Sequence, residues 1–137
     1  MAACSMLSFW PGGPQAQGLP SGMNTVAGQV SSKTNGNALT VTNSPNAIIN
    51  WKSFSIGAQN SVRFDQVNSG SKVLNRVTGN DPSSILGSLS SNGHVWLLNQ
   101  NGVLFGQGAR VNVAGLVAST LNMSDTNWLL GRHQFSL

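Results

Sequence analysis

The side chains that usually carry catalysis are few in this 137-residue sequence and lie far apart. The only acids are Asp65, Asp81 and Asp125, and glutamate is absent. Hydrolases and lyases need paired carboxylates, a general base or clustered Ca²⁺ ligands. Asp81 also belongs to an Asn-Asp-Pro sequence that is typical of a turn. We therefore expect no catalytic acid pair and predict that the protein is not an enzyme.

The sequence also lacks the residue patterns of metal, cofactor and nucleic-acid sites. His94 and His133 are the only histidines and Cys4 is the only cysteine, so we expect no metal site and no internal disulfide. The sequence has no Gly-x-Ser-x-Gly nucleophile motif, and the short Gly106-Gln107-Gly108 stretch fits a corner better than a phosphate-binding loop. The net charge of +4 comes from scattered Lys and Arg, which argues against a nucleic-acid stripe. We expect no cofactor.

Three tryptophans are candidates for stacking on sugar rings, because aromatic faces suit the C–H surfaces of glycans. Trp51 and Trp96 lie inside apolar runs, and we expect them in the core. We predict that Trp128 is the exposed one of the three and is a candidate glycan contact.

The segment 91–120 indicates which elements position these residues. It holds three short apolar runs, at 94–98, 103–105 and 111–117, separated by Asn-Gly or Gly-x-Gly corners. The corners are too short to hold helices, so each run is predicted to be a strand. Such strands could form antiparallel hairpins or successive faces of a parallel coil. Residues 95–98 and 103–105 are continuously apolar rather than alternating, which favours the coil.

The rest of the sequence repeats this pattern. Charged residues make up only 7% of the chain and hydrophobic residues 39%, which favours a folded all-β protein over a helical or disordered one. A short turn or helix is expected at 124–130, followed by the start of another strand. Further strands are predicted at 29–33, 38–42, 47–51, 54–56, 61–65, 72–77 and 84–89.

Segments 47–64, 74–93 and 97–120 resemble the amino-terminal haemagglutination activity domain of filamentous haemagglutinin-type exoproteins, which belong to bacterial two-partner secretion. The resemblance extends from Leu19 to the last residue. It implies a right-handed parallel β-helix with short extra strands at the N-terminal cap. It also implies a secretion-signal domain of a large exported surface adhesin, recognised by periplasmic domains of a cognate outer-membrane transporter. Folding of the β-helix would be nucleated outside the cell, which places the protein in the secreted or cell-surface fraction of a Gram-negative-type bacterium.

One family motif can be carried over residue by residue. The family has Asn-Pro-Asn-Gly after a hydrophobic strand, and the matching residues here are Asn99, Gln100, Asn101 and Gly102, with Gln100 in place of proline. Two roles remain open, a turn-stabilising corner and a direct role in transporter recognition. A second family motif, Asn-Pro-Asn-Leu, has no counterpart, since the corresponding stretch 68–72 reads NSGSK.

The two ends of the sequence and two alternative functions remain to be interpreted. Residues 1–17 are interpreted as a signal-peptide remnant or a disordered tail, and 18–137 as a secretion domain that is incomplete at its C-terminal end. A glycan-binding adhesin module that contacts host or cell-surface glycans through Trp128 is the first alternative. A fragment of a carbohydrate-active β-helix enzyme is the second.

Overall fold

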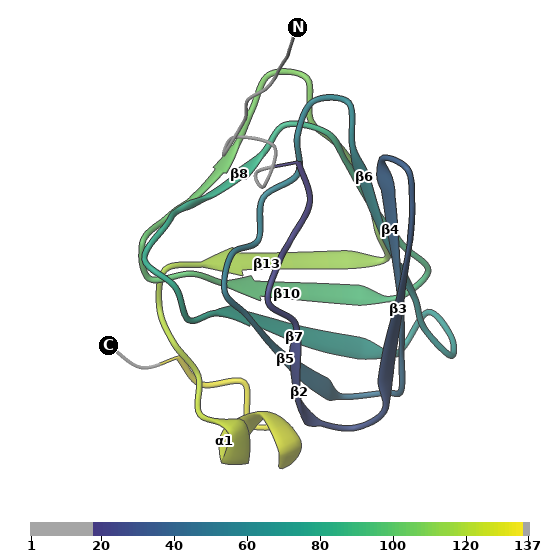
Figure 1. The fold of residues 1–137 in the computed structure, drawn as a ribbon. Helices are drawn as coiled ribbons and strands as arrows, with labels where there is room; N and C mark the ends of the chain where they lie inside the picture. The colour runs from purple at the N-terminus through teal and green to yellow at the C-terminus, as the bar shows by residue number, and fades with distance from the viewer. Residues whose placement is uncertain (1–17, 136–137) are drawn as a thin grey trace, which may run out of the picture.

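The computed structural model describes residues 18–135, and these wind into a parallel β-helix (Figure 1). The strands form three strips of sheet that run along the coil, in the orders β13-β10-β7-β5-β2, β12-β9-β6-β4-β3 and β11-β8. Their bounds are β2 (Asn24–Ala27), β3 (Val30–Asn35), β4 (Ala38–Asn43), β5 (Ala47–Trp51), β6 (Ser61–Asp65), β7 (Lys72–Val77), β8 (Ser83–Ile85), β9 (Ser88–Ser91), β10 (His94–Leu98), β11 (Val103–Phe105), β12 (Arg110–Asn112) and β13 (Gly115–Ser119).

Strands that stack between successive turns of the coil are parallel and in one-to-one register. His94 of β10 lies opposite Lys72 of β7 on one side and opposite Gly115 of β13 on the other. The same parallel pairing joins β4 to β6, β6 to β9, β9 to β12 and β8 to β11. Each complete turn of the coil is called a rung below. The predicted parallel coil is confirmed, and the antiparallel hairpin alternative is wrong for the segment after β4.

The N-terminal end carries two antiparallel strands, as expected for the cap. β2 pairs with β5, and β3 pairs with β4 through a two-residue hairpin loop of Gly36 and Asn37. Gly36 has φ 60°, a left-handed value that glycine adopts without a Cβ clash. Val30 and Met23 pack partly buried against the interior, so the cap covers apolar side chains at this end.

Four of the predicted strands need correction. The run at 84–89 is two strands, β8 and β9, with a bend at Gly87, and the run at 111–117 is β12 and β13 with a bend at Ala114. Apolar residues continue through both corners, so the pattern alone hid them. Segment 54–56 is irregular and contributes only an isolated bridge at Ile56. The strand predicted after 130 is absent up to residue 135.

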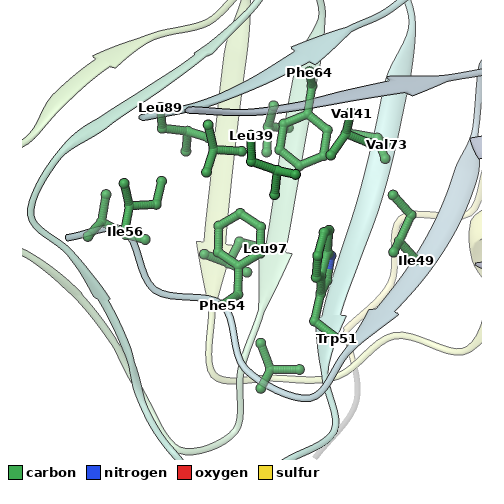
Figure 2. Close-up of a cluster of buried hydrophobic side chains, with 14 of the residues drawn as sticks. Leu39, Val41, Ile49, Trp51, Phe54, Ile56, Phe64, Val73, Leu89 and Leu97 are labelled. Atoms are coloured by element: carbon green, nitrogen blue, oxygen red, sulfur yellow. The ribbon is translucent and has the colours of Figure 1, made fainter. Parts of the chain in front are cut away.

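The interior of the coil is filled by side chains from all three strips. Figure 2 shows Trp51, Phe54 and Phe64 among aliphatic neighbours; the rings of Trp51 and Phe54 meet edge to face at 5.4 Å, and those of Phe54 and Phe64 stack at 6.3 Å. Asn75 is also fully buried here, and its Oδ1 accepts a hydrogen bond from the Trp51 indole at 2.8 Å. The buried apolar core consists of Leu39, Val41, Ala47, Ile49, Trp51, Phe54, Ile56, Val62, Phe64, Val73, Val77, Ile85, Leu89, Val95 and Leu97.

A second apolar cluster lies on the outer face of the strip β13-β10-β7-β5-β2. Alternate residues of β5, β7 and β10 point away from the interior, and Ile48, Leu74 and Leu98 among them are nevertheless buried. The helix α1 (Asp125–Leu129) folds back outside this strip and covers them (Figure 1). Ser124 caps α1 by accepting a hydrogen bond from the Asn127 amide, which agrees with the short helix predicted at 124–130.

Candidate functional site

The segment Asn99 to Gly102 forms a tight corner between β10 and β11. The Gly102 amide donates to the Asn99 carbonyl oxygen at 3.0 Å, and the Asn101 amide donates to Asn99 Oδ1 at 2.9 Å. Gly102 has φ 115°, which a residue with a Cβ rarely adopts. The asparagine side chain therefore closes the turn from within, as expected for a turn-stabilising role.

The same corner is fastened to the corner of the preceding rung. Asn99 Nδ2 donates to the Asp81 carbonyl oxygen at 2.9 Å and to Ser83 Oγ at 3.0 Å. Asn101 Nδ2 donates to the Gly79 carbonyl oxygen at 2.9 Å. Asn99 is only 1% exposed, so its amide donates and accepts within the protein and not to solvent. These contacts support the structural role, and the role in transporter recognition stays a prediction.

Gln100 and Asn101 lie on the surface of the corner, in contrast to Asn99. They border a depression of about 280 Å³ whose lining also includes Arg76, Asn80 and Asn122. The lining is mostly polar amides and backbone. A peptide could be read by hydrogen bonds at this surface, but Asn99 is out of its reach in the folded domain.

The acids predicted to be too far apart for catalysis occupy separate places. Asp65 pairs with Arg63 at 2.5 Å on the surface, and Asp125 pairs with Arg76 at 2.8 Å beside α1. The backbone carbonyl oxygen of Asp81 accepts a hydrogen bond from the Asn99 side chain. Within residues 18–135, no three His, Cys, Asp or Glu side chains gather as a metal site would require. In the same range, no helix has the length and apolar character to span a membrane.

The prediction that Trp128 is exposed is wrong. The residue is 2% exposed, and its ring meets that of Trp96 edge to face at 5.3 Å. Its indole N–H donates to the Asn46 carbonyl oxygen at 2.9 Å. The residues that bury it lie on the outer face of β5, β7 and β10, far away in sequence, so the residues next to Trp128 along the chain gave no sign of them. The buried ring offers no face for a sugar. Trp51, expected in the core, is buried there. Trp96, also expected in the core, is only partly buried and packs against the cluster on the outer face of the sheet.

Sequence reasoning missed a ladder of amides at another corner. The Gln66 backbone amide donates to Asn92 Oδ1 at 2.8 Å, and Asn92 Nδ2 donates back to the Gln66 carbonyl oxygen at 2.7 Å. Gln66 Nε2 donates to Ser91 Oγ at 3.0 Å, while its Oε1 accepts from Asn43 Nδ2 at 3.2 Å. The ladder joins three successive rungs. The sequence did contain a sign of this ladder. Its three amide side chains, Asn43, Gln66 and Asn92, are spaced by 23 and 26 residues, which is about one rung each.

A parallel β-helix with an antiparallel cap and amide-fastened corners defines the class of β-helical exoprotein domains. Residues 16–136 match the family described as the TPS secretion domain, where TPS stands for two-partner secretion. The chain belongs to this family and is the secretion-signal domain of an exported protein. The family expected from the sequence is thereby confirmed.

Relatives and a solved structure agree with this assignment. Two heme/hemopexin-binding proteins of Haemophilus influenzae are similar to the chain: the one from strain Rd is 44% identical over 79% of the chain, and the other is 41% identical over 85%. The chain spans only 12% and 13% of their lengths. The crystal structure of the HMW1 secretion domain from Haemophilus influenzae superposes with a TM-score of 0.84 at 42% identity, covering 85% of this chain and 32% of that one.

Proposed function

We propose that an outer-membrane transporter of the two-partner type reads this domain before the rung containing the Asn99–Gly102 corner has folded, and that the β-helix then forms outside the cell. The observation that carries the proposal is the burial of Asn99, which is 1% exposed with its amide bound to Asp81 and Ser83. A partner that recognises the side chain of Asn99 needs it released from these bonds. That release requires the corner to be unfolded.

The backbone of β10 supports the same order of events. In the folded domain β10 pairs with β7 on one edge and with β13 on the other, so its N–H and C=O groups are occupied. Recognition by strand addition pairs an extended peptide with the exposed edge of a sheet. The segment from β10 to Gly102 can join a periplasmic sheet edge only while it is still extended and free of its neighbouring rungs.

Folding after export follows from the register. Each rung lies directly on the one before it, with Leu97 opposite Asn75 on one side and Ala118 on the other. A folded strand offers a row of backbone donors and acceptors to the strand that follows, so rungs can add one at a time. Burial of apolar side chains at each step opposes return of the chain, which would favour outward movement without ATP.

The cellular setting is part of the proposal. The domain would be secreted or displayed at the surface of a Gram-negative-type bacterium, after crossing the inner membrane with a signal peptide. The signal-peptide interpretation of residues 1–17 lies outside the described residues. We propose that the protein carrying this domain is a surface adhesin or takes part in haem acquisition. The second activity is favoured by the two relatives described as heme/hemopexin-binding proteins.

The alternatives have less support. A glycan-binding module needs an exposed aromatic face, and its candidate, Trp128, is buried. A carbohydrate-active enzyme needs acids in proximity, and Asp65, Asp81 and Asp125 occupy separate places in the coil. We propose that the domain has no catalytic activity of its own.

Export measured alongside stability tests the proposal. The whole chain would be co-produced with its cognate transporter, and the exported fraction compared for Asn101→Ala and Gln107→Ala. Both side chains are exposed at corners, so both variants should fold, and only Asn101 belongs to the candidate motif. We expect several-fold less export of Asn101→Ala and unchanged export of Gln107→Ala. Equal export of both variants would contradict direct reading of the motif.

A further inference from the structure

We propose that the Asn35-Gly36 pair is a site of spontaneous deamidation, and that the fold protects the two other Asn-Gly pairs, Asn92-Gly93 and Asn101-Gly102. This modification goes beyond the proposed secretion function and needs no partner protein. The contrast among three identical dipeptides carries the inference, because their local chemistry is the same and only their surroundings differ.

The reaction is intramolecular. The backbone nitrogen of Gly36 loses its proton and attacks Cγ of Asn35, forming a new C–N bond. The bond from Cγ to Nδ2 breaks, and the nitrogen leaves as ammonia with the proton taken up. Water then opens the cyclic imide at either carbonyl and leaves an aspartate or an isoaspartate residue. Glycine at the second position permits the close approach because it has no Cβ. No oxidant or reductant takes part.

Asn92-Gly93 is held in place at both reacting groups. Both atoms of the Asn92 amide bind the backbone of Gln66, at 2.8 Å and 2.7 Å. The Gly93 amide, which would be the nucleophile, donates to Ser91 Oγ at 3.0 Å, and Gly93 is buried. Ring closure therefore requires three hydrogen bonds of the amide ladder to break together.

Asn101-Gly102 is held in a similar way. Asn101 Nδ2 donates to the Gly79 carbonyl oxygen at 2.9 Å, one rung away. The Gly102 amide donates to the Asn99 carbonyl oxygen at 3.0 Å and closes the turn. The pair can react only when the corner between β10 and β11 opens.

Asn35-Gly36 lacks these restraints. Within residues 18–135, the Asn35 side chain makes no hydrogen bond, and neither does the Gly36 amide. Asn35 is exposed, and a Cβ placed on Gly36 would have no atom within 4 Å. The pair sits at the tip of a hairpin whose outer strand, β3, is the last strand of its sheet among residues 18–135, with β4 as its one neighbour there. The Asn37 carbonyl oxygen accepts a hydrogen bond from the Ser61 amide at 3.0 Å, which holds the far side of the loop to the next rung. Fraying of β3 alone, with Asn35, disturbs its pairing with β4, whereas opening either other site disturbs stacked rungs.

Modification would alter the cap in a defined way. An isoaspartate adds one carbon to the backbone between β3 and the hairpin loop, which spoils the match of residue 35 with Ala38. Either product also adds a negative charge and so lowers the formal net charge of +4 by one. The modification should therefore affect the pairing register of β3 with β4 more than any other feature of the cap.

Mass spectrometry of the intact folded chain, aged in mildly alkaline buffer and then cut with trypsin, tests the proposal. Cleavage after Lys33 and Lys52 isolates Asn35, and cleavage after Arg76 and Arg110 leaves the other two pairs together as an internal comparison. Since local opening limits the protected sites, we expect deamidation at Asn35 to be about ten-fold faster or more. Fragmentation of the first peptide should place the change at Asn35.

Two controls make the result decisive. In denaturant the three pairs should react at similar rates, because only the fold distinguishes them. Asn35→Gln should remove the fast reaction while leaving the thermal unfolding midpoint unchanged, since the side chain is exposed and makes no hydrogen bond within residues 18–135 that the larger amide would lose. Equal rates for the three pairs in the folded chain, or a fast reaction confined to the peptide with Asn92 and Asn101, would overturn the proposal.

Discussion

The indole N–H of Trp128 donates to the backbone carbonyl of Asn46 at 2.9 Å and so ties α1 to the corner before β5. Through this bond the last helix of the described chain contacts one of its first rungs. Ile48, Leu74 and Leu98 lie beneath the ring on the outer face of the intervening strands. The coil is therefore stabilised by α1 packed on its outer face as well as by the apolar core in its interior.

Trp128→Ala should be strongly destabilising. Removing a buried aromatic ring from a packed cluster costs about 3–5 kcal/mol of unfolding free energy. The matched control is the next residue, Leu129, which is 54% exposed, and Leu129→Ala should change the unfolding free energy by about 0.5 kcal/mol or less. Urea denaturation followed by circular dichroism measures both. Similar losses for the two variants would show that α1 does not fasten the coil.

Asn99 and Asn101 should differ in their effect on stability. Asn99→Ala leaves the Asp81 carbonyl and Ser83 hydroxyl without their partner in a buried place, which should cost about 1–3 kcal/mol. Asn101→Ala removes one exposed hydrogen bond to Gly79 and should cost about 1 kcal/mol or less. Thermal unfolding of the two variants checks the order. A larger loss for Asn101→Ala would mean that the corner is held differently.

Gly87 marks a corner that has no space for a side chain. A Cβ there would lie 2.2 Å from the carbonyl oxygens of both Asn60 and Gly57, so the backbone must shift. Gly87→Ala should cost about 3 kcal/mol. A Cβ placed on Gly108 would lie 3.8 Å from its nearest neighbour, the Leu86 carbonyl oxygen, so Gly108→Ala should be nearly neutral. Comparable denaturation midpoints for the two variants would refute the close approach at Gly87.

Arg76 joins α1 to the outer face of the sheet. Its guanidinium donates to the Met123 carbonyl oxygen at 2.6 Å and forms an ion pair with Asp125 at 2.8 Å. Arg76→Met should cost about 1–3 kcal/mol, because these partners lose a charged donor. Asp125→Asn should cost less, since Asp125 is 44% exposed and the Met123 contact remains. Amide hydrogen exchange in α1 should rise for Arg76→Met, and unchanged exchange would contradict its role.

The repeated strands were predictable because each depends on a local pattern of apolar runs and corner residues. β6, β7, β10 and β11 have the bounds that the sequence indicates. The corners at Gly87 and Ala114 were harder to predict, since apolar residues lie close on both sides of them and no Asn-Gly pair or Gly-x-Gly sequence marks them. Both corners are bonded to the preceding rung, Ser88 to the Asn60 carbonyl oxygen and Ala114 to that of Gly93. The Asn99 corner is a turn at the residues matched to the family motif, and its role in transporter recognition stays a prediction.

The environment of Trp128 depended on information that no local window contains. Its burial requires α1 to fold back over strands whose outward residues, such as Leu74, are apolar. That outward row was visible in the sequence only as single apolar pairs, Ile48 beside Ile49 and Leu74 beside Val73. The same row could have indicated that something covers the outer face, but not that Trp128 does so.

Binding of the cognate transporter's periplasmic domains to the full chain tests the central claim most directly. Wild type, Gly108→Ala and Gly87→Ala would be titrated under one condition, with their unfolded fractions known from denaturation. If the corner is read before it folds, the apparent affinity should rise in proportion to the unfolded fraction, so Gly87→Ala binds most tightly and Gly108→Ala matches wild type. Binding of the folded wild-type chain as tight as that of Gly87→Ala would contradict recognition before folding.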